Sequence, residues 1–186
     1  MYWRSRYEPT RKGIPAIGRD HLFSVSMKHA RIRDYVPEDA AFLCRIFFEA
    51  VRITGLRDYS EAQVHAWAPQ MPDPADFAKR VGDGRFVLTA VDRNDLPVGY
   101  GEVERSGHID HLYCLPEMGR TGIGSALYDR LEQKAHELGI PRLFVEASEG
   151  AHRLFSRKGF VDVERREVLL RGVSLHHYVM EKWLRE

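Results

Sequence analysis

The chain has 186 residues, of which 44% are hydrophobic and 30% charged, a length and composition suited to one globular domain with a sizeable core. Its formal net charge is +1 with acids and bases interspersed, which argues against nucleic acid or a membrane surface as the main partner. The two cysteines, Cys44 and Cys114, fall in apolar patterns and are expected to be buried thiols of the reducing cytoplasm. Because no His or Cys cluster has metal-ligand spacing, we expect no metal.

The first 26 residues differ from the rest of the chain. Residues 1–26 hold five Lys and Arg against two acids, and they contain no apolar run long enough for a signal peptide or a membrane span. We expect a mobile N-terminal extension that precedes a single domain at residues 27–186. A nucleic-acid-binding arm or an organelle signal is the alternative for this extension.

The first half of the domain reads as one strand followed by helices. Residues 30–35 alternate apolar and charged side chains, which indicates a short strand, and the stretch 37–55 is typical of a helix begun by a proline and ended by a glycine. Ser60 and Gln63 have the spacing of a capping box and announce a second helix. A short third helix should include residues 77–81.

In the second half of the domain, the spacing of apolar residues becomes typical of strands. Strands are expected at residues 86–91, 97–104, 108–115, 143–147, 162–170 and 175–183, with helices at 123–138 and 148–158. The first three strands should form an antiparallel meander. The strand at 143–147 should run parallel to the one at 108–115, because the helix between them carries the chain back.

The stretch from Leu112 to Leu127 runs from a strand through a glycine loop directly into a helix. Such a junction favours an anion, because the first helical N–H groups lack partners and carry partial positive charge. A nucleoside-triphosphate loop is excluded, since Gly124 is followed by Ser125 and Ala126 where Lys and Ser or Thr are required. A dinucleotide loop is disfavoured, since Leu127 stands where a third small residue is needed.

The residues around this loop resemble a known family. Gly122, Ile123, Gly124, Ser125, Ala126 and Leu127, followed later by Phe155, Gly159 and Phe160, match the motifs of the GNAT superfamily of acyl-CoA-dependent N-acetyltransferases. The HID at 108–110, the RGV at 171–173 and the YVMEK ending further resemble small bacterial members without a well-defined substrate. The resemblance covers the chain apart from its N-terminal extension. It implies an α+β fold with a mixed, mostly antiparallel sheet of six or seven strands, helices on both faces, and a central parallel β-α-β cofactor unit.

The resemblance also implies which residues bind the cosubstrate, acetyl-CoA. Glycine at 122 and 124 would let the pyrophosphate approach the backbone N–H groups of residues 120–125, and the pantetheine arm would pair with the preceding strand. The implied cofactor-binding residues are Leu112, Tyr113, Cys114, Gly119, Arg120, Thr121, Gly122, Ile123, Gly124, Ser125, Ser148, Ala151 and Phe155.

The base and the acceptor site are less well marked. His108 falls where some members of the family keep a glutamate base, and Asp110 and Glu104 are the other catalytic candidates, although all three also suit a polar strand end. For the acceptor amine, the family points to the first helices and the last strands, where Tyr59, Trp67 and Tyr178 are aromatic candidates. A tryptophan at helical spacing, however, is more often part of a core than of a substrate wall.

Two residues depart from the family pattern. Gly119 stands where the family usually has Arg or Gln, with Arg120 beside it as a substitute charge, and Phe155 stands where many members have a tyrosine acid. The resemblance implies direct transfer of acetyl to a primary amine of a small molecule or peptide. The alternative is a catalytically weak CoA-binding sensor or interaction module. Dimers are common in the family, so a homodimer stays open.

Overall fold

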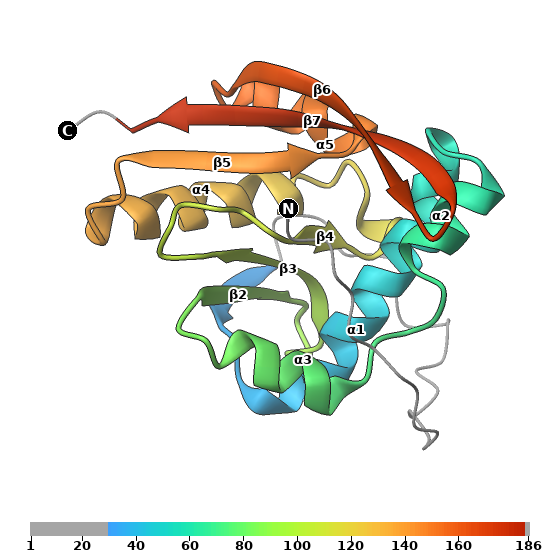
Figure 1. Ribbon diagram of the computed structural model, residues 1–186. Coiled ribbons are helices and arrows are strands. Elements are labelled where there is room, and N and C mark those ends of the chain that lie inside the picture. Colours follow the sequence, from blue (N-terminus) through green and yellow to red (C-terminus); the bar gives the residue numbers. More distant parts are fainter. Residues whose placement is uncertain (1–29, 185–186) are drawn as a thin grey trace.

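The computed structural model describes residues 30–184, so the N-terminal extension predicted for residues 1–26 lies outside the described part. The helices and strands follow one another along the chain as β1 (Arg31–Asp34), α1 (Ala40–Glu49), α2 (Glu61–Trp67), α3 (Pro74–Val81), β2 (Phe86–Val91), β3 (Pro97–Val103), β4 (Leu112–Cys114), α4 (Ile123–Glu137), β5 (Arg142–Ala147), α5 (Glu149–Arg157), β6 (Val161–Leu170) and β7 (Val173–Trp183). Figure 1 shows these elements in space. The predicted α+β class is confirmed.

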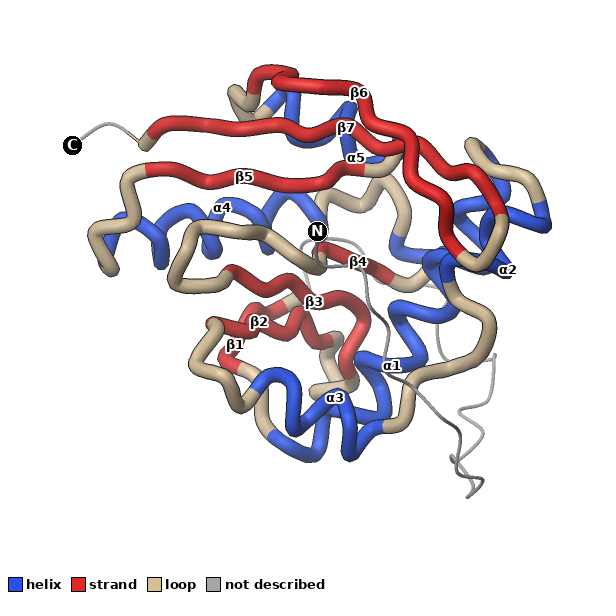
Figure 2. Tube along the Cα trace, viewed as in Figure 1, coloured by secondary structure: helices blue, strands red, loops and turns tan. Residues whose placement is uncertain are grey.

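The strands form two antiparallel sheets that adjoin. The first sheet has the order β1-β2-β3-β4 and the second has the order β5-β7-β6. A single parallel bridge between His108 and Phe144 connects them, just before β4 begins. Beyond this bridge β4 and β5 diverge, as Figure 2 shows. The predicted parallel relation between these strands is therefore present, but it opens into a gap along the length of β4.

Helices cover both faces of the first sheet. α1 and α3 pack against each other and α1 lies on β3, while α4 packs on β2, β3 and β4. Ile123, Leu127, Leu131 and Ala135 are almost completely buried, which confirms the predicted apolar stripe of α4. Leu138, predicted as its last member, is 36% exposed because it caps the helix instead of belonging to it.

The prediction of a continuous strand at 108–115 is wrong for its first half, because β4 begins only at Leu112. The N–H of Glu104 donates to the carbonyl of His108 and that of Glu102 to the carbonyl of His111, each at 2.9 Å. One residue of β3 therefore faces two residues, Ile109 and Asp110, on the neighbouring segment, which makes this segment a bulge. As a result His108 and Asp110, predicted to share a face, have different surroundings.

The first predicted helix is interrupted near its end. A 3-10 turn at Pro37–Asp39 precedes α1, and a π-helical turn at Ala50–Thr54 follows it. Such widened turns are often found at functional sites. Here Ala50, Val51 and Thr54 lie along the large cleft described below.

The capping box predicted for α2 is present. The N–H of Gln63 donates to Ser60 Oγ at 3.3 Å, and the N–H of Ser60 donates to Gln63 Oε1 at 2.9 Å. Ser60→Ala is expected to lower the free energy of unfolding by about 1 kcal/mol, because the N-terminal N–H groups of α2 lose their acceptor. Urea denaturation measures this change. Ser174→Ala, which removes an exposed hydroxyl outside any helix cap, is the control, and equal midpoints for the two variants would contradict the cap's contribution.

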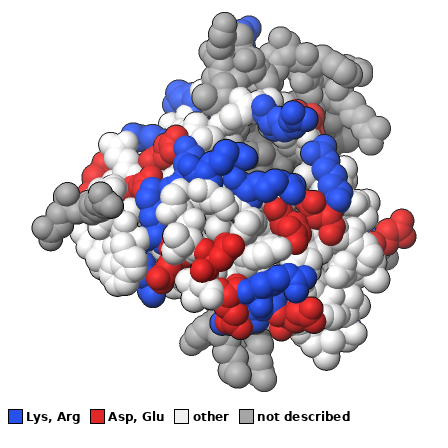
Figure 3. All heavy atoms as spheres, turned by 90° about the horizontal axis from the view of Figure 1, so that it is seen from above, with Lys and Arg blue, Asp and Glu red and all other residues white. Residues whose placement is uncertain are grey.

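Charges of both signs cover the face above β6 and β7. Figure 3 shows acidic and basic side chains beside one another there, and Glu164 pairs with Arg166 at 2.6 Å. Within residues 30–184, none of the helices is both long and apolar enough to cross a membrane.

Candidate active site

The glycine loop leaves the start of α4 open. After β4 the chain makes a 3-10 turn at Pro116–Met118, and Arg120 and Gly122 then adopt left-handed backbone angles with φ of 66° and 91°. Gly122 is the N-cap of α4, and because glycine has no side chain it does not cap the first N–H groups of the helix. These groups and the positive end of the helix dipole make an anion site.

A cleft of about 690 Å³ runs from this loop along the gap between β4 and β5. Most of the residues predicted to bind acetyl-CoA line it, namely Leu112, Tyr113, Cys114, Gly119, Arg120, Gly122, Gly124, Ser125, Ser148, Ala151 and Phe155. Thr121 and Ile123 are not among the lining residues. The Thr121 hydroxyl donates to the carbonyl of Met118 at 2.7 Å, and the Ile123 side chain is buried in the core.

Several arginines line the cleft. Arg57, Arg120, Arg153 and Arg157 are among its lining residues, which suits a ligand with several phosphate charges, and Arg153 also pairs with Asp58 at 3.5 Å. Gly119, where the family usually has Arg or Gln, lies in a tight turn. A Cβ atom there would come within 3.1 Å of the Pro116 carbonyl oxygen. The turn therefore favours glycine at 119, and Arg120 supplies a charge one residue later.

Two side chains in the middle of the cleft limit its chemistry. Phe155 is buried and packs edge-on against Tyr128 and Phe160, with ring centroids 5.9 and 5.0 Å apart, and it has no proton to give. Burial raises the pKa of the Cys114 thiol to about 12. This thiol is protonated at neutral pH and is a poor nucleophile, which disfavours an acyl-cysteine intermediate.

A smaller cavity of about 80 Å³ adjoins the cleft. Its lining consists of Tyr59, Trp67, Glu146, Ser148, Val168, Leu169, Leu170, Leu175, His176 and His177. Four of these residues, Tyr59, Trp67, Glu146 and Ser148, also line the cleft, so they form the boundary between the two spaces. Tyr178, the third aromatic candidate, lines neither space and donates to Glu149 at 2.8 Å.

Glu146 and His108 form a pair at this boundary. His108 Nε2 lies 2.6 Å from Glu146 Oε2, and the imidazole stacks on Phe144. Since an ionised carboxylate has no hydrogen, Nε2 is the donor. His108 lines neither space, whereas Glu146 lines both. Sequence reasoning missed Glu146, because its alternating position in β5 is also typical of an ordinary exposed residue.

The pair shifts the titration of both partners. Burial lowers the pKa of His108, but the hydrogen bond and charge of Glu146 outweigh it, so the pKa lies above the ordinary histidine value. The hydrogen bond from His108 lowers the pKa of Glu146 more than burial raises it. Glu146 is therefore a carboxylate at neutral pH.

Asp110 and Glu104, the other two candidates, are engaged by arginines. Asp110 Oδ2 lies 3.0 Å from both Arg80 and Arg85, and Glu104 lies 3.1 Å from Arg85. Burial favours the neutral form of Asp110, yet the surrounding cations hold its pKa far below the usual range. Because two arginines bind Asp110, its carboxylate is less available to accept a proton than one that pairs with a single histidine.

The carboxylates beside this arginine pair could by spacing hold a metal. Ligand atoms of Glu102, Asp110 and His111 lie within 4.8 Å of one another. Arg80 and Arg85, however, already bind Glu102 at 2.5 and 2.7 Å and neutralise it. The arrangement is that of a structural ion network, so the expectation that the protein uses no metal stays a prediction.

The raised pKa of His108 makes one part of the stability depend on pH. Protonated His108 favours the folded state, so this contribution is complete below the unfolded pKa of about 6.5 and is lost as the pH rises through the higher folded value. His108→Gln is therefore expected to destabilise the protein more at about pH 5.5 than at about pH 8.5. Urea unfolding at both pH values measures the difference. In a Glu146→Gln background the pH dependence should shrink, and an equal cost at both pH values in the wild-type background would contradict the pair.

Solved structures with the same fold define the class of this protein. A GCN5-related N-acetyltransferase from Rhodopseudomonas palustris, also described as an aminotransferase of class II, is 35% identical and superposes with a TM-score of 0.78 over 87% of this chain and 99% of that one. The acetyltransferase YncA of Salmonella typhimurium, solved with acetyl-CoA, is 22% identical with a TM-score of 0.66 over 84% of this chain and 95% of its own. The class is that of acyltransferases with an α+β fold.

The sequence comparisons give the family. Residues 55–182 match the model of the acetyltransferase (GNAT) domain. The chain is also 34% identical over 155 residues to the uncharacterized N-acetyltransferase YafP of Escherichia coli (strain K12), which covers 83% of this chain and 96% of YafP. The chain belongs to the GNAT family of N-acetyltransferases, as its loop motif indicated.

Proposed function

We propose that this protein binds acetyl-CoA in the cleft between β4 and β5 and transfers the acetyl group directly to a primary amine. The observation that carries the proposal is the wall that the two spaces share: a glycine-lined cleft with several arginines runs along an open strand edge, and one carboxylate lines both this cleft and a second pocket. A bound thioester and an amine would meet at that boundary.

The cleft suits each part of coenzyme A. The pyrophosphate would lie on the N–H groups of residues 120–125, with Arg120 beside it. The pantetheine arm would extend along Leu112, Tyr113 and Cys114, whose other edge already pairs with β3. Ser148, Ala151 and Phe155 would form the opposite wall.

The reaction needs one proton acceptor. An amine of pKa near 10 is mostly protonated at neutral pH, so it must lose a proton before it attacks. Glu146 would attract the ammonium group and accept that proton, with His108 holding the carboxylate in place. The amine nitrogen then forms a bond to the thioester carbonyl carbon, a backbone N–H of β4 stabilises the oxyanion, and the carbon–sulfur bond breaks to release the thiolate of coenzyme A. That thiolate takes up the second proton of the nitrogen, and Glu146 passes the first to solvent, which restores the carboxylate.

The second candidate function is binding of coenzyme A on the same fold without acetyl transfer. Phe155 gives no proton to the leaving thiolate, and this observation favours a CoA-binding sensor or interaction module. Thiol release from acetyl-CoA, followed over a panel of amines with mass detection of the product, separates the two. Acetylated amine at a rate above the uncatalysed reaction supports the transferase. Coenzyme A binding without turnover on any amine supports the module.

A further inference from the structure

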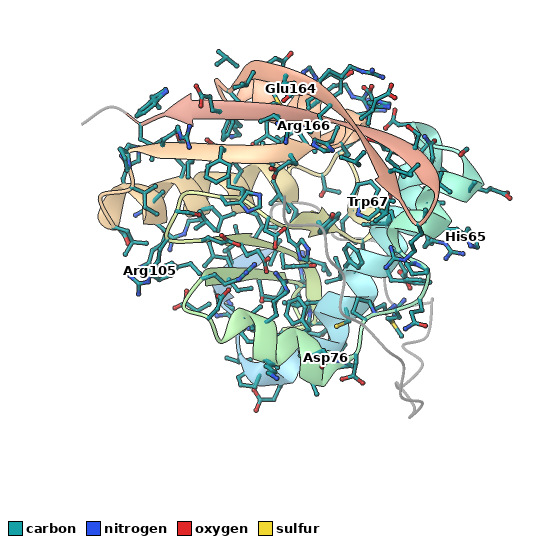
Figure 4. All side chains as sticks on the ribbon, viewed as in Figure 1. His65, Trp67, Asp76, Arg105, Glu164 and Arg166 are labelled. Carbon is teal, nitrogen blue, oxygen red and sulfur yellow. The ribbon has the colours of Figure 1, made fainter. Side chains whose placement is uncertain are left out.

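The small pocket beside the cleft is lined mainly by apolar and aromatic side chains. Tyr59 and Trp67 come from the α2 side, whereas Val168, Leu169, Leu170 and Leu175 come from the β6–β7 hairpin. Figure 4 shows Trp67 between α2 and this hairpin, and His65 of the same helix on the outer side. The volume of about 80 Å³ is roughly half that of a cavity that encloses benzene, so the pocket holds a short branched chain or part of a ring. Leu169 in its lining is 77% exposed, so a larger group can extend toward solvent.

The walls of this cavity are fixed to one another. Arg171, in the hairpin turn, donates to the carbonyl of Ala66 at 2.6 Å, and Gln63 Nε2 donates to the carbonyl of Ser174 at 2.9 Å. The Tyr59 hydroxyl donates to the carbonyl of His176 and accepts from the N–H of Glu149. The cavity is therefore preformed, and a ligand would bind without ordering its walls.

Two polar side chains in the lining, Glu146 and His177, could each bind a polar group of a ligand. Glu146 occupies the boundary with the cleft, where it can attract a cation. His177 belongs to the lining of the cavity, and its Nε2 atom is buried with no hydrogen-bond partner among residues 30–184. Burial lowers the pKa of His177, so the imidazole is neutral at pH 7. An unpaired buried nitrogen costs free energy that a suitable ligand atom would recover.

We infer that the acceptor is an amine borne on a small apolar group that also carries a hydroxyl, such as a hydroxyphenyl-alkylamine whose ring lies partly in the pocket and partly against the exposed Leu169. The ammonium would lie at Glu146, the ring between Trp67 and Leu169, and the hydroxyl near His177. A hydroxyl both donates and accepts, so it can pair with either neutral tautomer of the imidazole. This inference rests on the proposed function and adds the substrate class of the same site.

The test compares amines with and without the hydroxyl group, and amines with and without the aromatic ring. Tyramine is expected to be acetylated with a kcat/KM about tenfold above that of 2-phenylethylamine, which lacks the hydroxyl, and at least about 100-fold above those of ethanolamine and putrescine. Equal or better transfer to the hydrophilic amines would overturn the apolar pocket while leaving the transferase intact. A preference for hexanoyl-CoA over acetyl-CoA would overturn it as well, because the cavity would then hold the acyl chain. No transfer to any amine would overturn the proposed function itself, and tyramine binding in the presence of coenzyme A, measured by calorimetry, would then decide the pocket alone.

Two variants test which residues of the pocket produce the preference for tyramine. His177→Phe should reduce the tyramine preference over 2-phenylethylamine from about tenfold to about one, while 2-phenylethylamine itself is still acetylated. Leu169→Ala should raise KM for both aromatic amines about fivefold. Val163→Ala is the matched control, because Val163 is likewise an exposed apolar residue of β6 but does not line the cavity. An unchanged preference in His177→Phe, or equal effects of Leu169→Ala and Val163→Ala, would overturn the assignment.

Discussion

Replacing Gly124 with leucine is expected to lower the affinity for coenzyme A by about 100-fold or more, because the side chain would stand where phosphate oxygens approach the backbone. Gly124 lines the cleft in the first turn of α4, directly after the uncapped start of the helix. Each charge-assisted hydrogen bond to the pyrophosphate contributes about 1.5–3 kcal/mol, so the loss of two accounts for the expected change. Isothermal titration with coenzyme A measures it.

Position 124 is a better choice for this test than position 122. Gly122 has a φ of 91°, so any side chain there strains the backbone, and lost binding would not separate strain from blocked approach. A Cβ at Gly124 would instead meet only Cys114 Sγ and Leu154 Cδ2, both at 3.9 Å, which is ordinary contact. Gly124→Ala should therefore fold normally and lose a smaller part of the affinity. Unchanged affinity in a folded Gly124→Leu variant would refute the phosphate site in this loop.

The sequence was informative where a local rule determines the structure. The capping box at Ser60 and the apolar stripe of α4 depend on residues within one or two turns, and both are present as predicted. The strand at Phe86–Val91 has the predicted bounds, since its apolar run is bounded by turn residues. The same holds for the glycine loop, whose motif identified the family that the comparisons establish.

The features that the sequence did not reveal depend on distant residues. The bulge at Ile109 and Asp110 arises because Ile109 pairs with Phe144, which lies in another sheet. Glu146 pairs with His108, which lies 38 positions earlier in the chain, and no local pattern in the sequence indicates this contact. The cavity behind Glu146 likewise combines α2 with a hairpin about 100 residues later, and periodicity within either element does not indicate that they meet.

Glu146→Gln is expected to lower kcat for acetyl transfer by about 100-fold at neutral pH, because the amide is nearly isosteric with the carboxylate but accepts no proton. Affinity for coenzyme A should stay unchanged, since Glu146 is not among the groups proposed to hold its phosphates. The loss should diminish at alkaline pH, where more of the amine is unprotonated and needs no base. Initial rates of thiol release between neutral and alkaline pH measure all three effects.

Two further variants separate Glu146 from the groups behind it. His108→Gln keeps a donor for the carboxylate and should cost less than Glu146→Gln, because His108 holds the base without lining either space. Glu104 lies 3.7 Å from His108 Nδ1 on the side away from Glu146, so Glu104→Gln should change the rate only slightly. If His108→Gln or Glu104→Gln instead cost more than Glu146→Gln, the proton would be leaving through the bulge, and the base would be one of the residues that the sequence first indicated.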